Sequence, residues 1–247
     1  MKRYLMPLVA LLLINCKQTE KITFTAQEIV DESIKDSGGA LYGNHNTSFV
    51  FRDRTYISEV QDGQKILKRL SHLDSVRIMD LKTNLSFKRF INDTLVALPD
   101  SIANRYANSV NSVHYFARLP LGLNDPAVRK ELLGTESIKG KDYFKIKVTF
   151  DQKGGGDDFD DIYVYWFNKE TFKPDYLAYD FHVDGGGQRF REAFNERYIN
   201  GIRFVDYNNY KPKTKDSDIL DIGQSFDKDA LELLSKIELK DIKVTEN

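Results

Sequence analysis

The chain has 247 residues, enough for one domain of ordinary size. Apolar residues make up 41% of the chain and aromatic residues 12%, which is enough for a packed core and excludes a disordered chain. The formal net charge is −1, so there is no electrostatic basis for binding nucleic acid or an acidic membrane surface. The composition therefore predicts one folded domain that does not bind nucleic acid.

Residues 1–15 have the pattern of a signal peptide. Lys2 and Arg3 precede an apolar stretch, residues 5–14, that is too short to span a bilayer as a mature helix. The stretch ends at Leu13-Ile14-Asn15-Cys16, which resembles a bacterial lipobox, although Asn15 stands where Gly, Ala or Ser is usual. The resemblance implies that the thiol of Cys16 receives a diacylglycerol and that Cys16 becomes the mature N-terminus. The alternative is a free cysteine beside a cleaved signal peptide.

The lipobox interpretation divides the chain into three parts. Residues 1–15 are the signal peptide, residues 16–22 are a lipidated polar tether, and residues 23–247 are a single domain. More than one acyl chain makes membrane anchoring stable, so the expected location is the cell envelope, as an outer-membrane lipoprotein facing the periplasm or the surface. Cys16 is the only cysteine, so no disulfide within the chain is possible.

The first folded element is predicted to be a helix that starts near Thr25. Thr25 and Glu28 form a capping box, in which each side chain bonds the backbone N–H of the other residue. Gly38-Gly39 ends the helix, because glycine tolerates the left-handed conformation needed there. The apolar face is narrow, which predicts that the helix lies on a sheet.

Three turn dipeptides predict β-hairpins further along the chain. They are Asp62-Gly63, Lys139-Gly140 and Asn200-Gly201, which are typical of turns whose two central residues have positive φ. Residues 76–80, 85–91 and 95–98 predict further strands with looser turns.

Three helices are predicted after the first strands. Apolar residues at three- and four-residue spacing predict a helix from Asp100 or Ser101 to just before Pro120. Pro126 predicts the start of a shorter helix that ends at Gly134, and a last short helix is expected at residues 230–234, before a closing strand near residues 236–244. Together these elements predict an α+β domain with a strongly curved antiparallel sheet, a half-open barrel whose helices cover one side.

The order of these elements resembles the outer-membrane lipoprotein carrier (LolA-like) superfamily. The local likeness is strongest at residues 163–179, YVYWFNKETFKPDYLAY, which look like that superfamily's strand, turn and strand hairpin. Residues 108–116, 119–126, 153–158 and 185–192 also resemble an uncharacterised family of exported proteins from Bacteroidetes-type bacteria. The resemblance implies a LolA/LppX-like half-barrel that encloses an apolar cavity under helices, and it brings no known activity.

Common catalytic motifs are absent from the sequence. There is no His-Glu-x-x-His, no Gly-x-Ser-x-Gly and no second cysteine, so zinc-protease, hydrolase and thiol-redox chemistry have no support. We expect no cofactor. His114, near the end of the long predicted helix, suits a hydrogen bond to a backbone carbonyl, with a ligand or acid–base role as the alternative.

A polar rim is predicted where two glycine-rich loops meet. Antiparallel pairing of residues 161–167 with residues 175–183 brings the loop after residue 182 back beside the loop before residue 161. The charged rim residues expected to bind a ligand headgroup or a cation are Asp157, Asp158, Asp160, Asp161, His182, Arg189 and Arg191. The alternative is an ordinary charged hairpin tip, with the acids paired to the two arginines.

An apolar cavity is predicted behind the rim. Aromatic residues in the same two strands share sheet faces by the two-residue period, which fits either a packed core or a pocket under helices. The connector of residues 119–123 is expected to form part of the lid. The candidate ligand-binding residues of cavity and lid are Val113, Phe116, Leu121, Tyr165 and Phe181.

Three functions remain open from the sequence. The first is a monomeric, non-catalytic envelope lipoprotein that binds a lipid or other hydrophobic ligand. The second is a structural or interaction component of the envelope that uses the Gly/Asp-rich rim as a protein contact. The third is an enzyme acting on a sugar or phosphate at the rim, for which no catalytic constellation is suitably spaced.

Overall fold

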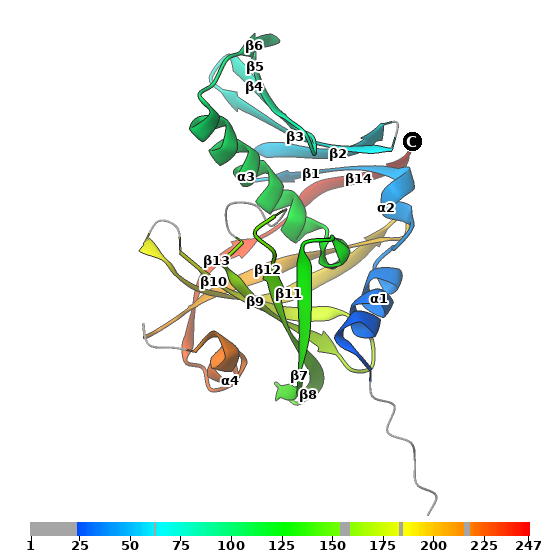
Figure 1. Ribbon diagram of the computed structural model, residues 1–247, viewed down its shortest axis with the longest axis vertical. Coiled ribbons are helices and arrows are strands. Elements are labelled where there is room, and N and C mark those ends of the chain that lie inside the picture. The colour runs from blue at the N-terminus through cyan, green and yellow to red at the C-terminus, as the bar shows by residue number, and fades with distance from the viewer. Residues whose placement is uncertain (1–23, 62, 154–158, 183–184, 215–217) are drawn as a thin grey trace, which may run out of the picture.

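The computed structural model describes residues 24–247, except residues 62, 154–158, 183–184 and 215–217. Cys16, Asp157 and Asp158 lie outside the described residues. The strands form two seven-stranded antiparallel sheets, one above the other in Figure 1, with a long helix running diagonally between them. In the described part of the chain, no helix is both long and apolar enough to cross a membrane.

The first sheet has the strand order β14-β1-β2-β3-β4-β5-β6. Its strands are β1 (His45–Phe51), β2 (Arg54–Gln61), β3 (Gln64–Leu73), β4 (Val76–Lys82), β5 (Phe87–Ile91), β6 (Thr94–Val96) and β14 (Lys240–Glu246). The second sheet has the order β13-β12-β11-β10-β9-β8-β7. Its strands are β7 (Val128–Ile138), β8 (Lys141–Phe150), β9 (Ile162–Asn168), β10 (Pro174–Phe181), β11 (Gly187–Ile199), β12 (Ile202–Pro212) and β13 (Leu231–Ile237).

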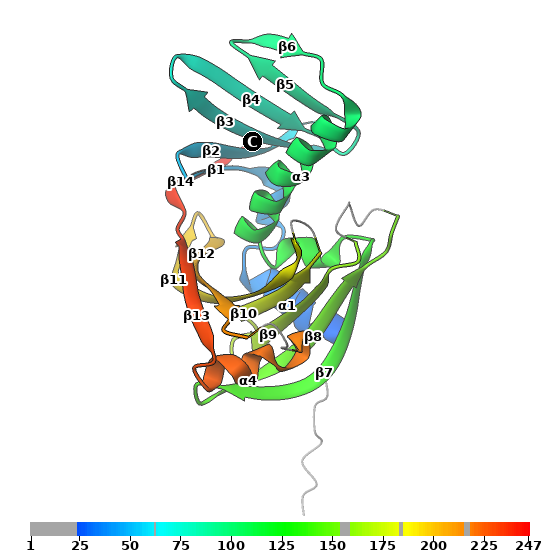
Figure 2. The same cartoon turned by 90° about the vertical axis from the view of Figure 1, so that its left-hand side faces the viewer.

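The helices connect and cover these sheets. They are α1 (Ala26–Asp36), α2 (Leu41–Asn44), α3 (Asp100–Ala117), the 3-10 helix η1 (Leu121–Asn124), the 3-10 helix η3 (Ile219–Asp221) and α4 (Ile222–Asp227). The helix α1 begins with the expected capping box, in which Thr25 accepts from the Glu28 N–H and Glu28 accepts from the Thr25 N–H. In the described part of the chain, the strands change sheet twice: between β6 and β7, through α3, and between β13 and β14 (Figure 2).

The two faces of the second sheet are covered by different helices. On one face, here called the inner face, Tyr165, Phe167 and Leu177 pack in one cluster with Ile29 and Val30 of α1. The opposite, outer face buries a second cluster against η3 and α4. This division follows from the alternation of side chains along a strand.

The helix α3 is fixed mainly to the first sheet. The buried Asp80 on β4 accepts hydrogen bonds from Arg69 at 2.6 and 3.0 Å and from Arg89 at 2.7 and 2.9 Å. Arg69 also donates to Ser109 Oγ of α3 at 2.8 Å, and the Arg89 guanidinium lies 3.4 Å from the centre of the Tyr106 ring. This network connects α3 to β3, β4 and β5 of the first sheet. Because α3 is held there, it does not need to pack against the second sheet along its whole length.

A third cluster fills the junction between the sheets. It joins Phe49 and Tyr56 of the first sheet to Phe204 of the second and to Leu239, which lies between β13 and β14. Arg197 donates to the carbonyl of Leu239 at 2.7 Å and to Asp206 at 2.9 Å, which fixes the crossing segment. The two sheets therefore share one continuous body.

Most of the predicted elements are present. The turns at Lys139-Gly140 and Asn200-Gly201 have positive φ at both residues, and β2 pairs with β3 through Gln61 and Gln64. The antiparallel, open and curved architecture is confirmed. The structure adds that the strands divide into two sheets and that α4 covers the face opposite α1 and α3.

The helix predicted from Pro126 to Gly134 is wrong, because this segment starts the strand β7. The side chains of β7 alternate between less and more exposed positions along its whole length, which is a strand period. Gly134 has φ +113° at a register shift between β7 and β8, so it marks a β-bulge and not the end of a helix. The nearest helical turn among the described residues is η1, just before Pro126.

The short helix predicted at residues 230–234 is also wrong. These residues begin β13, which pairs with β12 from Tyr207↔Ile237 to Pro212↔Leu231. The helical turn lies earlier, in α4, and ends before Asp229, whose φ is +55°. Leucine and glutamate are good helix formers, but helix propensity is a weak preference that pairing along a long neighbouring strand overrides.

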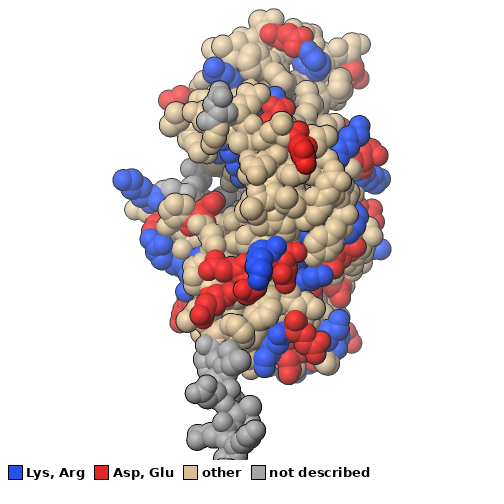
Figure 3. All heavy atoms as spheres, turned by 90° about the vertical axis from the view of Figure 1, so that its right-hand side faces the viewer, with Lys and Arg blue, Asp and Glu red and all other residues tan. Residues whose placement is uncertain are grey.

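Charges are mixed on the side of the molecule that carries α1. Acidic and basic side chains are interspersed over its lower half, below a broad area of uncharged residues (Figure 3). This face has no extended patch of one sign, in agreement with a net charge of −1. It offers no electrostatic feature of a nucleic-acid-binding surface.

Candidate functional site

A cavity of about 360 Å³ lies between the C-terminal half of α3 and the inner face of the second sheet. One wall is helical and the other is formed by neighbouring strands of the sheet. The lining residues are Phe51, Arg52, Ser112, Val113, Phe116, Ala117, Asp161, Tyr163, Tyr179, Phe181, Arg189, Arg191, Val205, Tyr207, Asn209, Ile237 and Leu239. The volume is in the lower part of the range for small-molecule sites.

The sheet side of the cavity is aromatic because β9 and β10 place the same side chains on one face. Tyr163 is the cross-strand partner of Tyr179, and their rings stack with centroids 5.4 Å apart. Phe116 of α3 lies 5.6 Å from the Tyr179 ring, and Phe181 lies 6.1 Å from it. Such contacts hold a cross-strand pair in place without filling the space between the sheet and the helix.

The cavity is lined by the cross-strand pair Tyr163 and Tyr179 but not by the next pair on the same face, Tyr165 and Leu177. Tyr165 is fully buried, and its hydroxyl is 2.8 Å from the hydroxyl of Tyr115. Burial raises the pKa of both phenols, so both stay neutral and share one hydrogen bond. Tyr165 therefore belongs to the core beside α1 and does not line the cavity.

Arg191 is the most unusual side chain of the cavity. It is 8% exposed, its Nη2 donates to the Tyr179 hydroxyl at 3.0 Å, and its guanidinium lies 3.8 Å from the centre of the Phe116 ring. Its Nε has no hydrogen-bond partner, and no carboxylate of the described residues forms an ion pair with it. A cation over an aromatic face gains about 2 kcal/mol when desolvated, whereas burying a charge costs several kcal/mol. The arrangement therefore leaves a positive charge without full compensation.

Other buried arginines have different surroundings. Arg69 pairs with Asp80 at 2.6 Å, and Arg203 pairs with Glu196 at 2.5 Å. Arg118 has no ion pair with a described carboxylate, but it donates to Ser58 at 3.1 Å and does not line the cavity. Burial lowers the pKa of Arg118. Arg191 is thus the buried arginine that combines a missing ion pair with an accessible cavity.

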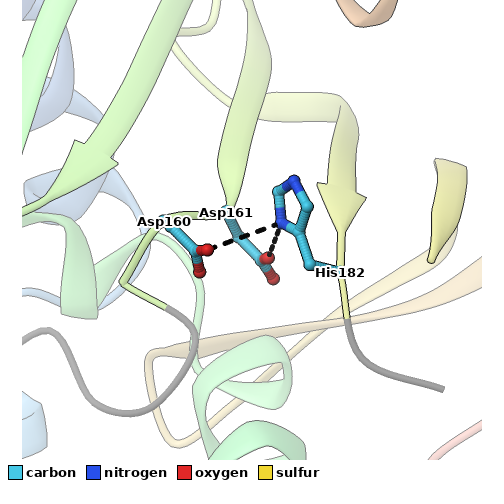
Figure 4. A group of neighbouring side chains, drawn as sticks. All are labelled: Asp160, Asp161 and His182. Carbon is cyan, nitrogen blue, oxygen red and sulfur yellow. Dashed lines mark hydrogen bonds and ion pairs between the residues drawn. The ribbon is translucent and has the colours of Figure 1, made fainter. Parts of the chain in front are cut away.

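The mouth of the site holds a small charged group from two strand ends. His182 follows β10, and Asp160 and Asp161 precede β9, so the strand pairing brings them together (Figure 4). His182 Nδ1 lies 3.2 Å from Asp161 Oδ1 and 3.9 Å from Asp160 Oδ2. The hydrogen bond to Asp161 raises the pKa of His182, with a smaller contribution from the charge of Asp160.

These three residues have the donor atoms that a divalent cation accepts. One atom from each of them lies within 4.8 Å of the other two. However, the side chains of His182 and Asp160 are 61% and 58% exposed, and an ion pair is sufficient to explain the contacts. The geometry is that of a charged lip and supplies no catalytic arrangement.

The structure brings the predicted rim and the predicted cavity together into one site. Asp161, Arg189 and Arg191 from the rim line the same cavity as Val113, Phe116 and Phe181. Asp160 and His182 lie at its mouth, and Asp157 and Asp158 lie outside the described residues.

Two of the predicted residues are placed elsewhere. Leu121 packs in the junction cluster between the sheets, and Tyr165 lies in the core beside α1. Conversely, sequence reasoning missed the wall from β12, where Val205, Tyr207 and Asn209 line the cavity. Their two-residue alternation after the Asn200-Gly201 turn was the available signal.

His114 has the structural role that its position favoured. It is buried against Phe49 and Tyr56, and its Nε2 lies 3.2 Å from the carbonyl of Lys68. Burial lowers its pKa from the usual 6.5 to about 3, so the ring is neutral near pH 7. It lies on the side of α3 that faces the first sheet and does not line the cavity.

A family of unknown function, DUF6503, matches residues 46–239. The chain belongs to DUF6503. The matched segment contains every described residue of the cavity and its mouth. The comparison with curated proteins gave no match. Membership in DUF6503 agrees with the resemblance to an uncharacterised family and brings no activity with it.

Several solved structures are similar to this DUF6503 chain at low sequence identity. A LolA superfamily protein from Nitrosomonas europaea is 14% identical with a TM-score of 0.52, covering 91% of this chain and 96% of that one. A putative outer membrane lipoprotein-sorting protein domain from Vibrio parahaemolyticus is 10% identical with a TM-score of 0.46, covering 89% and 92%. A DUF1329 family protein from Desulfovibrio piger is also 10% identical, with a TM-score of 0.45 and coverage of 90% and 92%. The first similarity confirms the expected LolA-like fold, and at such identity it shows the fold alone.

Proposed function

We propose that this protein is a non-catalytic lipoprotein of the cell envelope that binds a lipid or other hydrophobic ligand under α3. The observation that supports this function best is the cavity of about 360 Å³ between α3 and the aromatic inner face of the second sheet. A concave site that combines aromatic and aliphatic surface with polar groups is a usual form of a small-molecule site.

The envelope location rests on the N-terminal sequence and agrees with the LolA-like fold. Residues 1–15 would direct export, and lipidated Cys16 would hold residues 23–247 at the membrane through the short tether. The expected result is that the full-length protein expressed in a bacterium fractionates with membranes and that C16S moves it to the soluble fraction. Release of the full-length protein without detergent would contradict the anchor but not the cavity.

The binding function can be tested on soluble protein that starts at residue 17. We expect the neutral apolar probe N-phenyl-1-naphthylamine to bind with a stoichiometry of about one per chain, because the cavity is small. Native mass spectrometry of freshly purified protein should show a co-purified lipid in part of the population. A protein that takes up no probe, even after delipidation in organic solvent and refolding, would refute a hydrophobic-ligand function.

The rim as a protein contact remains the second hypothesis from the sequence. Asp157 and Asp158 of the predicted rim lie outside the described residues. No described contact favours it over ligand binding.

A further inference from the structure

The charges of the described residues that line the cavity do not balance. Among its described lining residues are three arginines, Arg52, Arg189 and Arg191, and one carboxylate, that of Asp161. Asp161 already has a partner in His182 at the mouth. A neutral apolar ligand would leave this positive excess unused, whereas an anionic group inside the cavity would be attracted to it.

Arg191 identifies where such an anion would lie. Its guanidinium has five N–H donors in a planar fork, and the described residues accept one hydrogen bond from it, at Tyr179. The side chain is more than nine-tenths buried and lines the cavity, so an anion that pairs with it must occupy the cavity itself. Planar forks bind carboxylate and phosphate groups well because two parallel N–H donors match two oxygens.

Tyr179 and Phe116 hold Arg191 in position for this contact. The Tyr179 hydroxyl accepts from Nη2, so its own proton can be donated to an oxygen of the ligand. The Phe116 ring covers one face of the guanidinium at 3.8 Å, which leaves the edge of the fork as its binding surface. A preorganised donor pair of this kind loses little side-chain entropy when the ligand binds.

The rest of the cavity suits one acyl chain. Val113, Phe116, Tyr163 and Phe181 provide apolar surface on both sides, and the volume of about 360 Å³ is too small for a large multi-chain lipid. We propose that the ligand is an anionic amphiphile, one acyl or alkyl chain with a carboxylate or phosphate headgroup, whose anion pairs with Arg191. This inference rests on the proposed function and specifies the chemical class of its ligand.

The test is displacement of N-phenyl-1-naphthylamine from soluble protein that starts at residue 17. The competitors are dodecanoate, dodecyl phosphate, uncharged dodecanol and inorganic phosphate. We expect at least one of the two anionic amphiphiles to displace the probe at concentrations about tenfold or more below those of dodecanol, because hydrogen bonds to charged groups are stronger than neutral ones. Inorganic phosphate alone should have no effect, since it has no chain.

Arg191→Gln should remove this preference while the probe still binds, and Arg191→Lys should keep part of it. Arg118→Gln is the matched control, since Arg118 is also buried without an ion pair to a described carboxylate but does not line the cavity. It should keep the full preference for anionic chains. Comparing the variants by urea unfolding separates a loss of folding from a loss of selectivity.

Each outcome bears on a different conclusion. Probe binding with equal displacement by dodecanol and both anionic amphiphiles would overturn the inference and leave the hydrophobic-ligand function intact. Equal selectivity in wild type and Arg191→Gln would also overturn it. Displacement by inorganic phosphate alone would replace the amphiphile with a free anion. Failure of the probe to bind at all would instead count against the proposed function.

Discussion

The two faces of the second sheet are made by the same strands, yet one is filled and the other is partly hollow. On the outer face, α4 places Phe226 4.6 Å from the ring centre of Phe190, and the surrounding side chains are buried. On the inner face, Tyr165 is buried in the cluster that includes α1, but beside Tyr163 the sheet faces a cavity. Both faces are rich in aromatic residues, so aromatic content alone does not decide which face binds a ligand.

The difference lies in how each covering helix is held. The six-residue α4 follows η3 directly and packs straight on the outer face. The eighteen-residue α3 is held to the first sheet by Arg69, Asp80 and Arg89, so only its C-terminal half reaches over the inner face. A helix anchored elsewhere can leave space on the sheet that it covers, and the cavity lies on this side of the second sheet.

The largest expected effect is on the filled face. Phe190→Ala removes a fully buried ring, and we expect a loss of about 3–5 kcal/mol in the free energy of unfolding. Phe181→Ala on the hollow side should cost only about 1 kcal/mol, because its ring already borders a cavity. Urea unfolding of both variants followed by circular dichroism measures the two losses. Equal losses would mean that the two faces are packed alike.

This asymmetry also explains how much the sequence could predict. Local signals were reliable where the chain's own chemistry decides the structure, as in the capping box at Thr25 and Glu28 and the turn at Asn200-Gly201. They failed at β7 and β13, where pairing with a neighbouring strand decides between helix and strand. No local pattern reports which partner strand will be available.

The site shows the same limit. The hairpin of β9 and β10 predicted that His182 meets the aspartates, and the structure has that contact at 3.2 Å. The strand period placed Tyr165 and Phe181 on one face, but only Phe181 lines the cavity, because Tyr165 is fully buried with its hydroxyl bonded to Tyr115 of α3. The sequence could not show where α1 and α3 end on the sheet, since this depends on contacts between residues far apart in the chain.

The second-largest effect is a change in the pH dependence of stability, and it concerns the side of α3 that packs on the first sheet. His114 is buried with its pKa lowered to about 3, so the unfolded chain binds a proton more readily than the folded protein below pH 6.5. Its contribution is therefore fully present above pH 6.5 and is lost as the pH falls from there toward about 3, by roughly 1.4 kcal/mol per pH unit. His114→Gln should flatten the fall in unfolding free energy between pH 6.5 and 5. An unchanged slope would show that His114 is accessible to protons in the folded state.

The third prediction fills the hollow side. Val113→Trp places a large side chain in the cavity, and we expect affinity for N-phenyl-1-naphthylamine to fall by about tenfold or more, because the probe and the indole compete for the same space. Asn104→Trp is the control, since Asn104 is exposed on the same helix and does not line the cavity. Fluorescence titration at one protein concentration gives both affinities. A probe that binds Val113→Trp as tightly as wild type would lie somewhere other than the cavity under α3.

The smallest effect is expected at the open mouth. The hydrogen bond to Asp161 raises the pKa of His182. The contribution of this bond to the free energy of unfolding is therefore fully present below the usual pKa of 6.5, and it is lost as the pH rises through the raised pKa of His182. Asp161→Asn should bring the pKa of His182 back toward 6.5, and Asp160→Asn should change it less, because Asp160 is 3.9 Å away and Asp161 is 3.2 Å away. Titration of the His182 ring protons by NMR measures each value. The contrary result is that Asp160→Asn lowers the pKa of His182 more than Asp161→Asn does. The exposed Asp160 would then be the main partner of protonated His182, and the mouth would be electrostatically separate from the cavity that Asp161 lines.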